Sequence, residues 1–402
     1  MKKTFTLLIV SLIFSITGTA QNKAGSQTDS VLINNIIETV RQQYVPDKRT
    51  SIYEIKILKG DNNPTLKGYI SNKETYKELI KILRDKQIQY KDSIEVLPTK
   101  SLGDKIYGVI NLSVADIRTK GDFSAEMATQ ALLGTPIRIL QEDDWYRIQT
   151  PDEYIAWTQK ANFHPMTKQE FNNWIRSPKL IFTDYFGFSY QYPDKEKQTI
   201  GDLVTGNILR YEGESGDFYK VSYPDGRSTY ILKHQARPYK EWKASLVQTG
   251  DSYVKKAFKL MGIPYVWGGT SVKGMDCSGF TKDVLFQHGV ILTRDASQQV
   301  NTGTAVDISN GYDNLQIGDL MFFGKKASGD KKERIRHVAF YIGNKEFIHA
   351  SGCIRIGSLD PEKPNYDERN TTEFIRASRI TNAIDTKGIW DIDNNPMYQE
   401  ID

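Results

Sequence analysis

Cysteine is scarce in this chain: only Cys277 and Cys353 occur among its 402 residues. A scaffold built on several disulfide bonds is therefore excluded, and at most one such bond can form. We expect two free thiols instead. Cys277 lies in a glycine-rich stretch ahead of a helical pattern, which favours a reactive thiol. Cys353 lies at the edge of an expected strand, which favours a small packed residue.

Long apolar runs and strong net charge are also missing, with one exception at the N-terminus. Lys2 and Lys3 precede an apolar run over residues 5–16, and small residues follow at 18–20. This pattern predicts a signal peptide over residues 1–20, and the run is too short to favour a membrane anchor. We therefore expect an exported protein, periplasmic or secreted, without a membrane anchor after cleavage. The net charge of +4, or +2 without the two lysines, gives no support for a nucleic-acid partner.

The rest of the chain divides into five segments by its patterns. Residues 21–110 combine two helical patterns with an alternating strand, which predicts a small α+β cap or spacer. Two β-barrels are expected at 111–166 and 167–243, a cysteine-containing domain at 244–385 and a C-terminal tail at 386–402. With 39% hydrophobic residues, a chain of this length can hold two to four domains with cores of their own.

The two barrels are predicted from a degenerate internal repeat. Each copy has an aliphatic strand, an acidic turn, an aromatic strand, a Pro-Asp turn and a strand with a tyrosine. In both copies the proline follows an aromatic-strand tyrosine by five positions: Tyr146 and Pro151, then Tyr219 and Pro224. Short alternating strands with turn residues between them are typical of small barrels. This order resembles that of bacterial SH3-like domains, which would serve as spacers, as wall-recognition modules or as one side of an active site.

Glycines surround Cys277. The stretches PYVWGG at 264–269 and GMDCSGF at 274–280 contain four of them, and apolar residues at helical spacing follow until Gly289. This pattern predicts a loop that delivers Cys277 to the first turn of a buried helix. Because a helix N-terminus favours negative charge, we expect it to lower the pKa of the thiol and to raise the thiolate fraction.

The five histidines are the candidate bases. His164 precedes a proline, His234 lies in a lysine-rich loop and His288 lies at the end of the cysteine helix, so we expect structural roles for these three. His337 begins an alternating strand, and His349 ends the next strand. These two histidines are therefore the candidates for catalysis.

The turn at residues 343–345 decides whether His337 and His349 can act together. A three-residue loop pairs position 337 with 351 and position 339 with 349. Both imidazoles then lie on one face of the sheet as diagonal neighbours, about 7–8 Å apart. A two-residue loop places them on opposite faces, so a joint role requires an odd loop or a bulge.

Cys277, His337 and His349 together would allow nucleophilic catalysis. The thiolate attacks an acyl carbon, His337 exchanges the proton, and His349 fixes the tautomer and orientation of His337. The backbone N–H of Cys277 and the hydroxyl of Tyr265 are candidate donors for an oxyanion hole. Zinc binding is the competing use of these residues, but no fourth ligand stands at a suitable spacing. We therefore expect neither a metal nor another cofactor.

Six stretches, in this order within residues 250–360, resemble the NlpC/P60 family of cell-wall cysteine peptidases. They are YVWGG at 265–269, DCSGF at 276–280, RDASQQ at 294–299, GDLMFF at 318–323, HVAFYIG at 337–343 and HAS at 349–351. The resemblance implies a papain-like fold in which the cysteine helix packs on an antiparallel sheet that carries both histidines. The expected fold class is therefore multidomain α+β: a papain-like NlpC/P60 catalytic domain preceded by two SH3-like β-barrels and a small α+β N-terminal region.

The domain order resembles the subfamily described as γ-D-glutamyl-L-diamino acid endopeptidases, or dipeptidyl-peptidase VI. It implies that the partners are peptidoglycan stem peptides, cleaved between D-glutamate and the diamino acid. A free N-terminal L-alanine would be required, and L-Ala-D-Glu would be released for cell-wall peptide recycling or turnover. A murein amidase acting at the muramoyl-L-alanine bond and a non-catalytic cell-wall-binding protein are the alternatives. The diamino acid and the oligomeric state are left open.

The same resemblance implies a set of substrate-binding residues. They are Asp276, Ser278, Ser297, Tyr154, Glu126 and Trp267. Asp276 is expected to bind the amine of the substrate, and Glu126 and Tyr154 of the first barrel are expected to close that site. The chain departs from the family there, because Glu153 replaces the glycine of the usual Asp-Gly-Tyr and Ala156 replaces the glycine of Gly-Trp.

Overall fold

The computed structural model describes residues 21–60 and 63–402. It contains two compact units, one that ends at Leu97 and one over Pro98–Asp402. The expected signal peptide, residues 1–20, lies outside the described residues. None of the helices described is long and apolar enough to cross a membrane.

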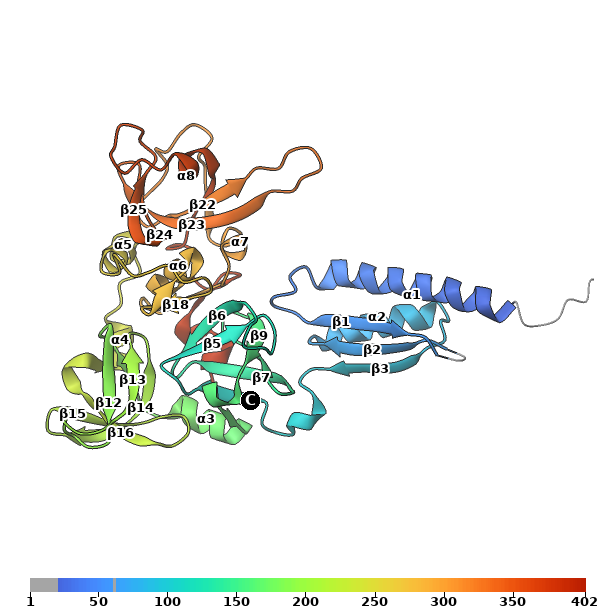
Figure 1. Ribbon diagram of the computed structural model, residues 1–402, viewed down its shortest axis with the longest axis horizontal. Helices are drawn as coiled ribbons and strands as arrows, with labels where there is room; N and C mark the ends of the chain where they lie inside the picture. The colour runs from blue at the N-terminus through green and yellow to red at the C-terminus, as the bar shows by residue number, and fades with distance from the viewer. Residues whose placement is uncertain (1–20, 61–62) are drawn as a thin grey trace, which may run out of the picture. The chain divides into compact units, whose positions relative to one another are not determined.

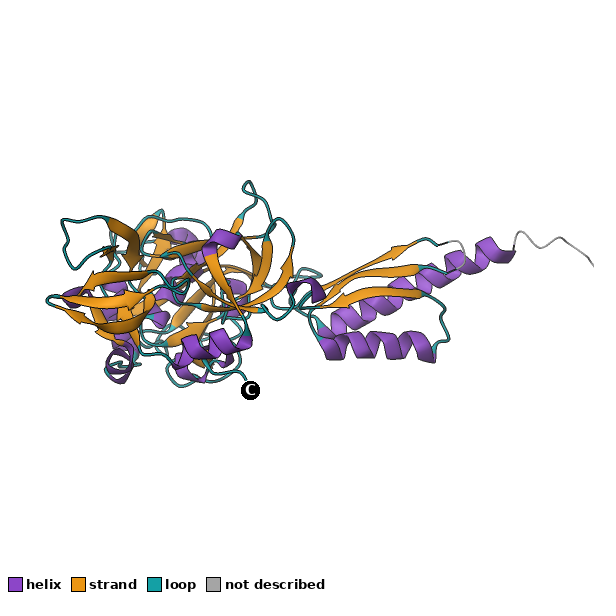
Figure 2. Cartoon of the chain, turned by 90° about the horizontal axis from the view of Figure 1, so that it is seen from below, coloured by secondary structure: helices purple, strands orange, loops and turns teal. Residues whose placement is uncertain are grey.

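The first unit is a three-stranded sheet covered by two helices (Figure 2). Its elements are α1 (Gln21–Tyr44), β1 (Tyr53–Leu58), β2 (Thr65–Ile70), α2 (Lys73–Asp85) and β3 (Lys91–Val96). β2 pairs antiparallel with β1 and parallel with β3, so α2 is the crossover helix. Asn72 caps α2 by accepting hydrogen bonds from the N–H groups of Glu74 and Thr75. The expected small α+β region is therefore present.

A seven-stranded antiparallel sheet, here called the first β domain, opens the second unit. Its strands are β4 (Tyr107–Ile110), β5 (Val114–Arg118), β6 (Met127–Leu132), β7 (Pro136–Glu142), β8 (Tyr146–Gln149), β9 (Ile155–Thr158) and β10 (Phe163–Met166), with 3₁₀ turns at Lys100–Leu102 and Lys160–Asn162. The strand order is β10-β4-β7-β8-β9-β5-β6. The expected boundary at residue 110 is wrong, because β4 pairs with β7 and β10 inside this domain.

The second β domain repeats this topology. After α3 (Lys168–Arg176) its strands are β11 (Lys179–Phe182), β12 (Phe186–Tyr190), β13 (Thr199–Val204), β14 (Ile208–Ser215), β15 (Phe218–Ser222), β16 (Ser228–Leu232) and β17 (Ala236–Pro238), with a 3₁₀ turn at Lys233–Gln235. Numbered within each domain, the strands have the same order as in the first. Gly134 and Gly206 lie at equivalent turns with φ of 86° and 90°, a conformation that favours glycine. The sequence repeat is thus a repeat of strand order.

The remaining residues form the cysteine domain, a six-stranded antiparallel sheet with helices on both sides (Figure 1). The helices are α5 (Gly250–Phe258), α6 (Cys277–Phe286), α7 (Ala296–Gln299) and α8 (Glu368–Glu373), whereas α4 (Tyr239–Ala244), which precedes them, packs on β11 and β17 of the second β domain. The sheet contains, in spatial order, β21 (Thr304–Val306), β26 (Phe374–Arg379), β22 (Leu320–Lys325), β23 (Arg334–Gly343), β24 (Glu346–Ser351) and β25 (Cys353–Ser358). Phe340 packs on Phe280 of α6 from one face, and Phe347 and Phe374 pack on the other.

The C-terminal residues are integrated into the second unit. Short elements surround the domain: β18 (Thr270–Ser271) with β19 (Gly274–Met275), β20 (Val290–Leu292) with β27 (Ile389–Asp391), and 3₁₀ turns at Ile392–Asn394 and Pro396–Tyr398. Asn395 donates to the Pro151 carbonyl of the first β domain, and Asn172 of α3 exchanges two hydrogen bonds with Ile401. The expectation of a separate tail at 386–402 is therefore wrong, because these residues pair with the rest of the unit.

Candidate active site

The loop ahead of Cys277 packs against the start of α6 through glycines. A Cβ added at Gly279 would lie 1.9 Å from the Gly269 carbonyl oxygen, so a larger residue does not fit there. Gly268 has a φ of 80°, and a Cβ on it would lie 2.3 Å from the Met127 carbonyl of β6. These close approaches explain why the sequence concentrates glycines around the cysteine. They bring the loop, the helix start and the first β domain together.

Asp276 is the N-cap of α6 and is almost fully buried. Its carboxylate accepts hydrogen bonds from the N–H groups of Gly279 (2.7 Å) and Gly268 (2.9 Å) and from the hydroxyl of Ser278 (3.3 Å). Arg294 adds two more, at 3.1 and 2.6 Å. Two carboxylate oxygens offer about four acceptor positions, so all are in use. Asp276 is thus anchored at the helix start by both backbone and side-chain donors, and its role in binding a substrate amine stays a prediction.

Arg294 is the residue that sequence reasoning missed. Its side chain is 1% exposed, and besides Asp276 it binds the hydroxyls of Ser278 (2.8 Å) and Thr129 (3.0 Å). Thr129 belongs to β6, so this one guanidinium connects the helix start with the first β domain. The signal for Arg294 in the sequence is its position inside the stretch RDASQQ, which also contains the predicted site residue Ser297.

Cys277 is buried at the first position of α6, with 7% of its surface exposed. Burial and then the Asp276 carboxylate raise the pKa of the Cys277 thiol to about 12, while the N–H groups of Val338 and Ser278 act in the opposite direction. The expectation that the helix start lowers this pKa is wrong, because desolvation of the thiolate outweighs the helix dipole. The resting thiol is therefore protonated.

The strands β23 and β24 bring the two histidines together through a bulge. Phe340 pairs with Ile348, a register equivalent to pairing 337 with 351, and the register shifts between Tyr341 and Gly343. The tight turn that follows has Asn344 and Lys345 in the left-handed region, with φ of 51° and 61°. The condition stated for this pair, an odd loop or a bulge, is met by the bulge.

His337 and His349 are hydrogen-bonded to each other. Nε2 of His337 lies 2.8 Å from Nδ1 of His349, and the rings meet edge to face with centroids 5.0 Å apart. Burial is the largest cause that lowers both pKa values, well below the usual value for His337 and to about 4 for His349. Both imidazoles are therefore neutral near pH 7. The buried Nε2 of His349 has no hydrogen-bond partner within the described chain.

The tautomers follow from this bond. If His337 donates from Nε2, its Nδ1 carries a lone pair and can take a proton, and His349 accepts at Nδ1. The Cys277 sulfur contacts β23 at the N–H of Val338, the residue after His337. Within the part of the chain that the structure describes, no hydrogen bond joins the sulfur to the His337 ring. The arrangement offers a neutral thiol, a neutral base and a group that orients the base.

Tyr265 lies beside the thiol and is half-buried. Burial, followed by the charges of Cys277 and Asp276, raises the pKa of its hydroxyl. The phenol therefore stays protonated and can donate a hydrogen bond close to the sulfur. This is the chemistry that an oxyanion hole needs.

Known proteins share this architecture. Residues 262–376 match the NlpC/P60 family, and residues 117–162 match the bacterial dipeptidyl-peptidase SH3 domain. A γ-D-glutamyl-L-lysine dipeptidyl-peptidase of Bacillus subtilis is 31% identical over 237 residues, which cover 55% of this chain and 71% of that protein. The chain belongs to the NlpC/P60 family of cysteine peptidases. Cys277 and both histidines lie inside the matched range.

Two further proteins are similar to this NlpC/P60 peptidase. A γ-D-glutamyl-L-lysine dipeptidyl-peptidase of Bacillus cereus is 29% identical over 253 residues, covering 60% of this chain and 73% of that protein. The crystal structure of an NlpC/P60 family protein from Bacillus cereus has a TM-score of 0.58 at 24% identity and covers 68% of this chain and 99% of that one. The second likeness shows a shared fold.

The first β domain of the NlpC/P60 peptidase, which contains the SH3 match, holds two predicted site residues, Glu126 and Tyr154. Glu126 is exposed and accepts a hydrogen bond of 2.6 Å from the indole of Trp267, itself 63% exposed. Tyr154 is buried in the core of the domain, close enough to Arg294 to act on its charge. Glu153, next to Tyr154, has a φ of 66°, a conformation that favours glycine.

The two predicted serines lie in different surroundings. Ser278 is buried and binds both Asp276 and Arg294, so it belongs to the network at the helix start. Ser297 is exposed on α7, where its carbonyl accepts from Asn301. Both cysteines are free thiols, as expected.

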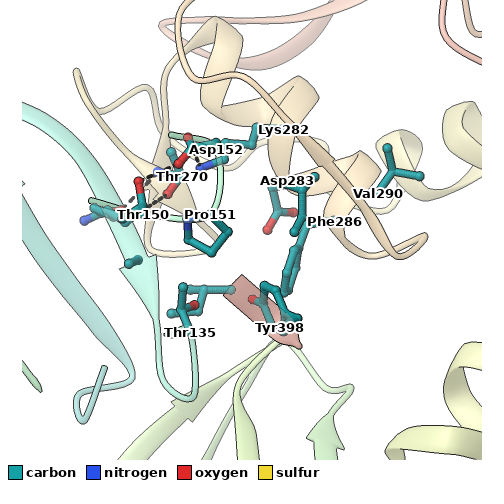
Figure 3. A pocket seen from close by; sticks show the side chains of 14 residues that line it. Thr135, Thr150, Pro151, Asp152, Thr270, Lys282, Asp283, Phe286, Val290 and Tyr398 are labelled. Carbon is teal, nitrogen blue, oxygen red and sulfur yellow. Dashed lines mark hydrogen bonds and ion pairs between the residues drawn. The ribbon is translucent and has the colours of Figure 1, made fainter. Parts of the chain in front are cut away.

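A cavity of about 50 Å³ lies away from the thiol, between the first β domain, α6 and the C-terminal residues (Figure 3). The carboxyl of Asp283 points into this space, and Lys282 binds Asp152 at 2.7 Å on one side. Burial is the main cause that raises the pKa of Asp283 to about 7, although Gln287 donates to it at 2.6 Å. The partly apolar cavity lies where the first β domain meets the cysteine domain, and its lining contains none of Cys277, His337 and His349.

Proposed function

We propose that this NlpC/P60 peptidase hydrolyses the γ-D-glutamyl–L-diamino acid bond of peptidoglycan stem peptides. The observation that carries the proposal is the hydrogen bond between His337 and His349 beside the start of the cysteine helix. The names of the Bacillus relatives, γ-D-glutamyl-L-lysine dipeptidyl-peptidases, support the choice of bond. The substrate is taken to carry a free N-terminal L-alanine, and the product is L-Ala-D-Glu.

In the proposed mechanism Cys277 is the nucleophile. Because its thiol is protonated at rest, the sulfur attacks the γ-carbonyl carbon as its proton passes to Nδ1 of His337. The oxyanion is bound by the backbone N–H of Cys277 and the hydroxyl of Tyr265. His337 then protonates the departing amine, and a thioester remains. Water, deprotonated by His337, hydrolyses the thioester and restores the thiol.

The orienting role falls to His349. A neutral imidazole that accepts at Nδ1 keeps the proton of His337 on Nε2 and its lone pair on Nδ1. The carbonyl of a stem peptide brings no charge to the site before attack, so a nucleophile and a base that are both neutral at rest suit it. The low pKa of His337 keeps it available as a base in weakly acidic solution.

Selection of a free amine is assigned to Glu126. Asp276 has its charge balanced by Arg294, whereas Glu126 is an exposed carboxylate that accepts a hydrogen bond from the neutral Trp267 indole. An ammonium group needs such a partner when it leaves water. A stem still attached to glycan has no free amine and leaves this carboxylate unsatisfied. Glu126 and Trp267 therefore define the side of the site that receives L-alanine.

The two β domains are proposed to be SH3-like barrels, and residues 1–20 an export signal. The identical strand order supports the first of these proposals, and the basic and apolar pattern of the N-terminus supports the second. The first domain then serves as one wall of the active site, since β6 contacts Arg294 and the loop of Gly268. Export would bring the enzyme to its substrate for peptide recycling or turnover.

The test is hydrolysis of L-Ala-γ-D-Glu-diamino acid peptides, with the alanine amine free or acetylated. Mass spectrometry should detect L-Ala-D-Glu from the peptide with a free amine only. In Glu126→Gln the rates of cleavage of the free and the acetylated peptide should lie closer together than in the wild type. Cys277→Ala should lose on the order of 10⁴-fold or more in kcat. Equal cleavage of the acetylated peptide would refute the exopeptidase assignment, and release of stem peptides from intact sacculi would indicate an amidase.

A further inference from the structure

The sheet continues beyond His349 with an arginine on the next strand. β25 lies beside β24 at the edge of the sheet (Figure 1). Arg355 of β25 pairs directly with His349 in the register of the two strands, so the two side chains share one face. The Arg355 side chain is 53% exposed. Its nearest carboxylate, Asp367, lies 3.9 Å away and already accepts two hydrogen bonds from Asn370 at the start of α8. Arg355 therefore has donors left for a ligand.

Two more guanidinium groups lie on this side of the histidine pair. Arg336 binds Glu373 and Asn370, and Arg369 lies 3.7 Å from the same Glu373 with its side chain 72% exposed. One carboxylate is thus shared by two arginines. Together Glu373 and Asp367 pair with the three arginines, and Glu368 is a further exposed carboxylate at the start of α8.

The three arginines, here called the arginine wall, lower the pKa values of the histidines. After burial, Arg355 is the next largest cause that lowers the pKa of His349, and Arg336, Arg369 and Arg355 all act on His337. Asp367 acts on His349 in the opposite direction without cancelling them. All three arginines therefore lie close enough to the reacting centre to lower the pKa of His337, and Arg355 and Arg336 also lower that of His349.

The contacts of β25 indicate where the arginine wall lies relative to Cys277. Just before this strand the Gly352 carbonyl accepts a hydrogen bond from the N–H of Tyr265. Cys353, the first residue of the strand, forms an isolated antiparallel β-bridge with Pro264. The strand thus runs along the loop that flanks Cys277. With the alanine end of the substrate proposed to lie at Glu126 and Trp267, the part beyond the scissile bond is taken to extend past His349 toward Arg355.

We propose that Arg355 binds a carboxylate of the leaving diamino acid, and so selects one that ends in a carboxylate, as meso-diaminopimelate does, over one that ends in an ammonium group, as lysine does. This inference rests on the proposed function. It departs from the lysine in the names of the Bacillus relatives. A guanidinium matches a carboxylate with two parallel donors, whereas it repels an ammonium group.

The experiment compares two peptides, L-Ala-γ-D-Glu-meso-diaminopimelate and L-Ala-γ-D-Glu-L-lysine, at low and moderate salt. The full-length wild-type enzyme is expected to favour the first in kcat/KM by about tenfold or more. Arg355→Ala should remove most of this preference, mainly through KM, and Arg355→Glu should reverse it. Arg138→Ala, which removes an exposed arginine from β7 of the first β domain, is the control for net charge and should leave the ratio unchanged.

The pH profile gives a second readout that a loss of packing would not move. Arg355→Ala removes a positive charge near both imidazoles, so the acidic limb of kcat/KM should shift upward in pH for both peptides. Equal cleavage of the two peptides by the wild type, or a preference that survives in Arg355→Ala, would overturn the inference. If neither peptide is cleaved by the wild type, the proposed function itself is wrong. The two outcomes that overturn only the inference differ from this one, because in both of them the wild type cleaves the peptides.

Discussion

Arg294 and Asp276 form a buried ion pair beside Cys277. Guanidinium nitrogens donate to both carboxylate oxygens at 3.1 and 2.6 Å, and the two side chains are 1% and 9% exposed. Because Nε of Arg294 also donates to Thr129 of β6, the pair connects the start of α6 to the first β domain. The geometry of the nucleophile therefore depends on a domain that does not contain it.

Replacement of Arg294 tests this connection. Arg294→Met leaves the Asp276 carboxylate buried without its counter-ion, and we expect the free energy of unfolding to fall by about 3–5 kcal/mol. In the double variant with Asp276→Asn, no buried charge is left without a counter-ion, and the amide oxygen can still accept from one of the two backbone N–H groups, so part of the loss should be recovered. Denaturant unfolding measures both. A single variant within about 1 kcal/mol of the wild type would contradict the assignment.

Labelling of Cys277 tests the state of the thiol. Its pKa is raised to about 12 by burial and by Asp276, so iodoacetamide should react slowly near neutral pH. The rate should rise about tenfold per pH unit from roughly pH 7 to pH 9, because the thiolate is the reacting form. Mass spectrometry separates Cys277 from Cys353. A rate that is already constant over this range would reveal a thiolate–imidazolium pair in the resting enzyme.

The reactive residues could be found from the sequence because they rest on local patterns. The glycines around Cys277 predict a tight loop and a helix start. Because side chains alternate along β23 and β24, the turn between these strands alone decides whether His337 and His349 lie on one face of the sheet. That turn could not be settled beforehand, since a bulge between Tyr341 and Gly343 depends on packing across the sheet.

The parts that were missed depend on contacts between distant segments. Nothing in the stretch RDASQQ indicates that Arg294 meets Asp276, because the pairing is made by the fold and not by spacing along the chain. The boundary at residue 110 failed for the same reason: β4 is short, and only its pairing with β7 and β10 assigns it to the first β domain. The thiol pKa was misjudged because burial cannot be read from a local motif.

Position 349 offers a test of the orienting bond. His349→Ala removes the acceptor for Nε2 of His337, and kcat should fall about 100-fold or more. His349→Asn places an amide oxygen near the position of Nδ1 and should keep activity within about tenfold of the wild type. The measurement is kcat and KM on the stem peptide, with unfolding curves to show that both variants fold. An equal loss in the two variants would mean that ring size, and not hydrogen bonding, is what matters.

Asp283 predicts a change of stability with pH that is independent of catalysis. Its pKa is raised from 3.8 to about 7, mainly by burial, so the native state holds a proton that the unfolded state releases above about pH 4. The stability that this proton contributes is complete below the unfolded pKa and is lost as the pH rises through about 7. The slope is at most about 1.4 kcal/mol per pH unit.

Asp283→Asn removes this dependence. The amide is neutral at every pH and can still accept the hydrogen bond from Gln287, and its volume matches that of the protonated acid beside the cavity. We therefore expect the variant to unfold at about the same free energy as the wild type near pH 4 and to be more stable by about 1–3 kcal/mol near pH 8. Denaturant unfolding at both pH values measures this, with Asp144→Asn as an exposed control on the first β domain. A difference between variant and wild type that does not change with pH would show that Asp283 is already ionised in the native state, stabilised by Lys256, and that the cavity is better hydrated than its lining indicates.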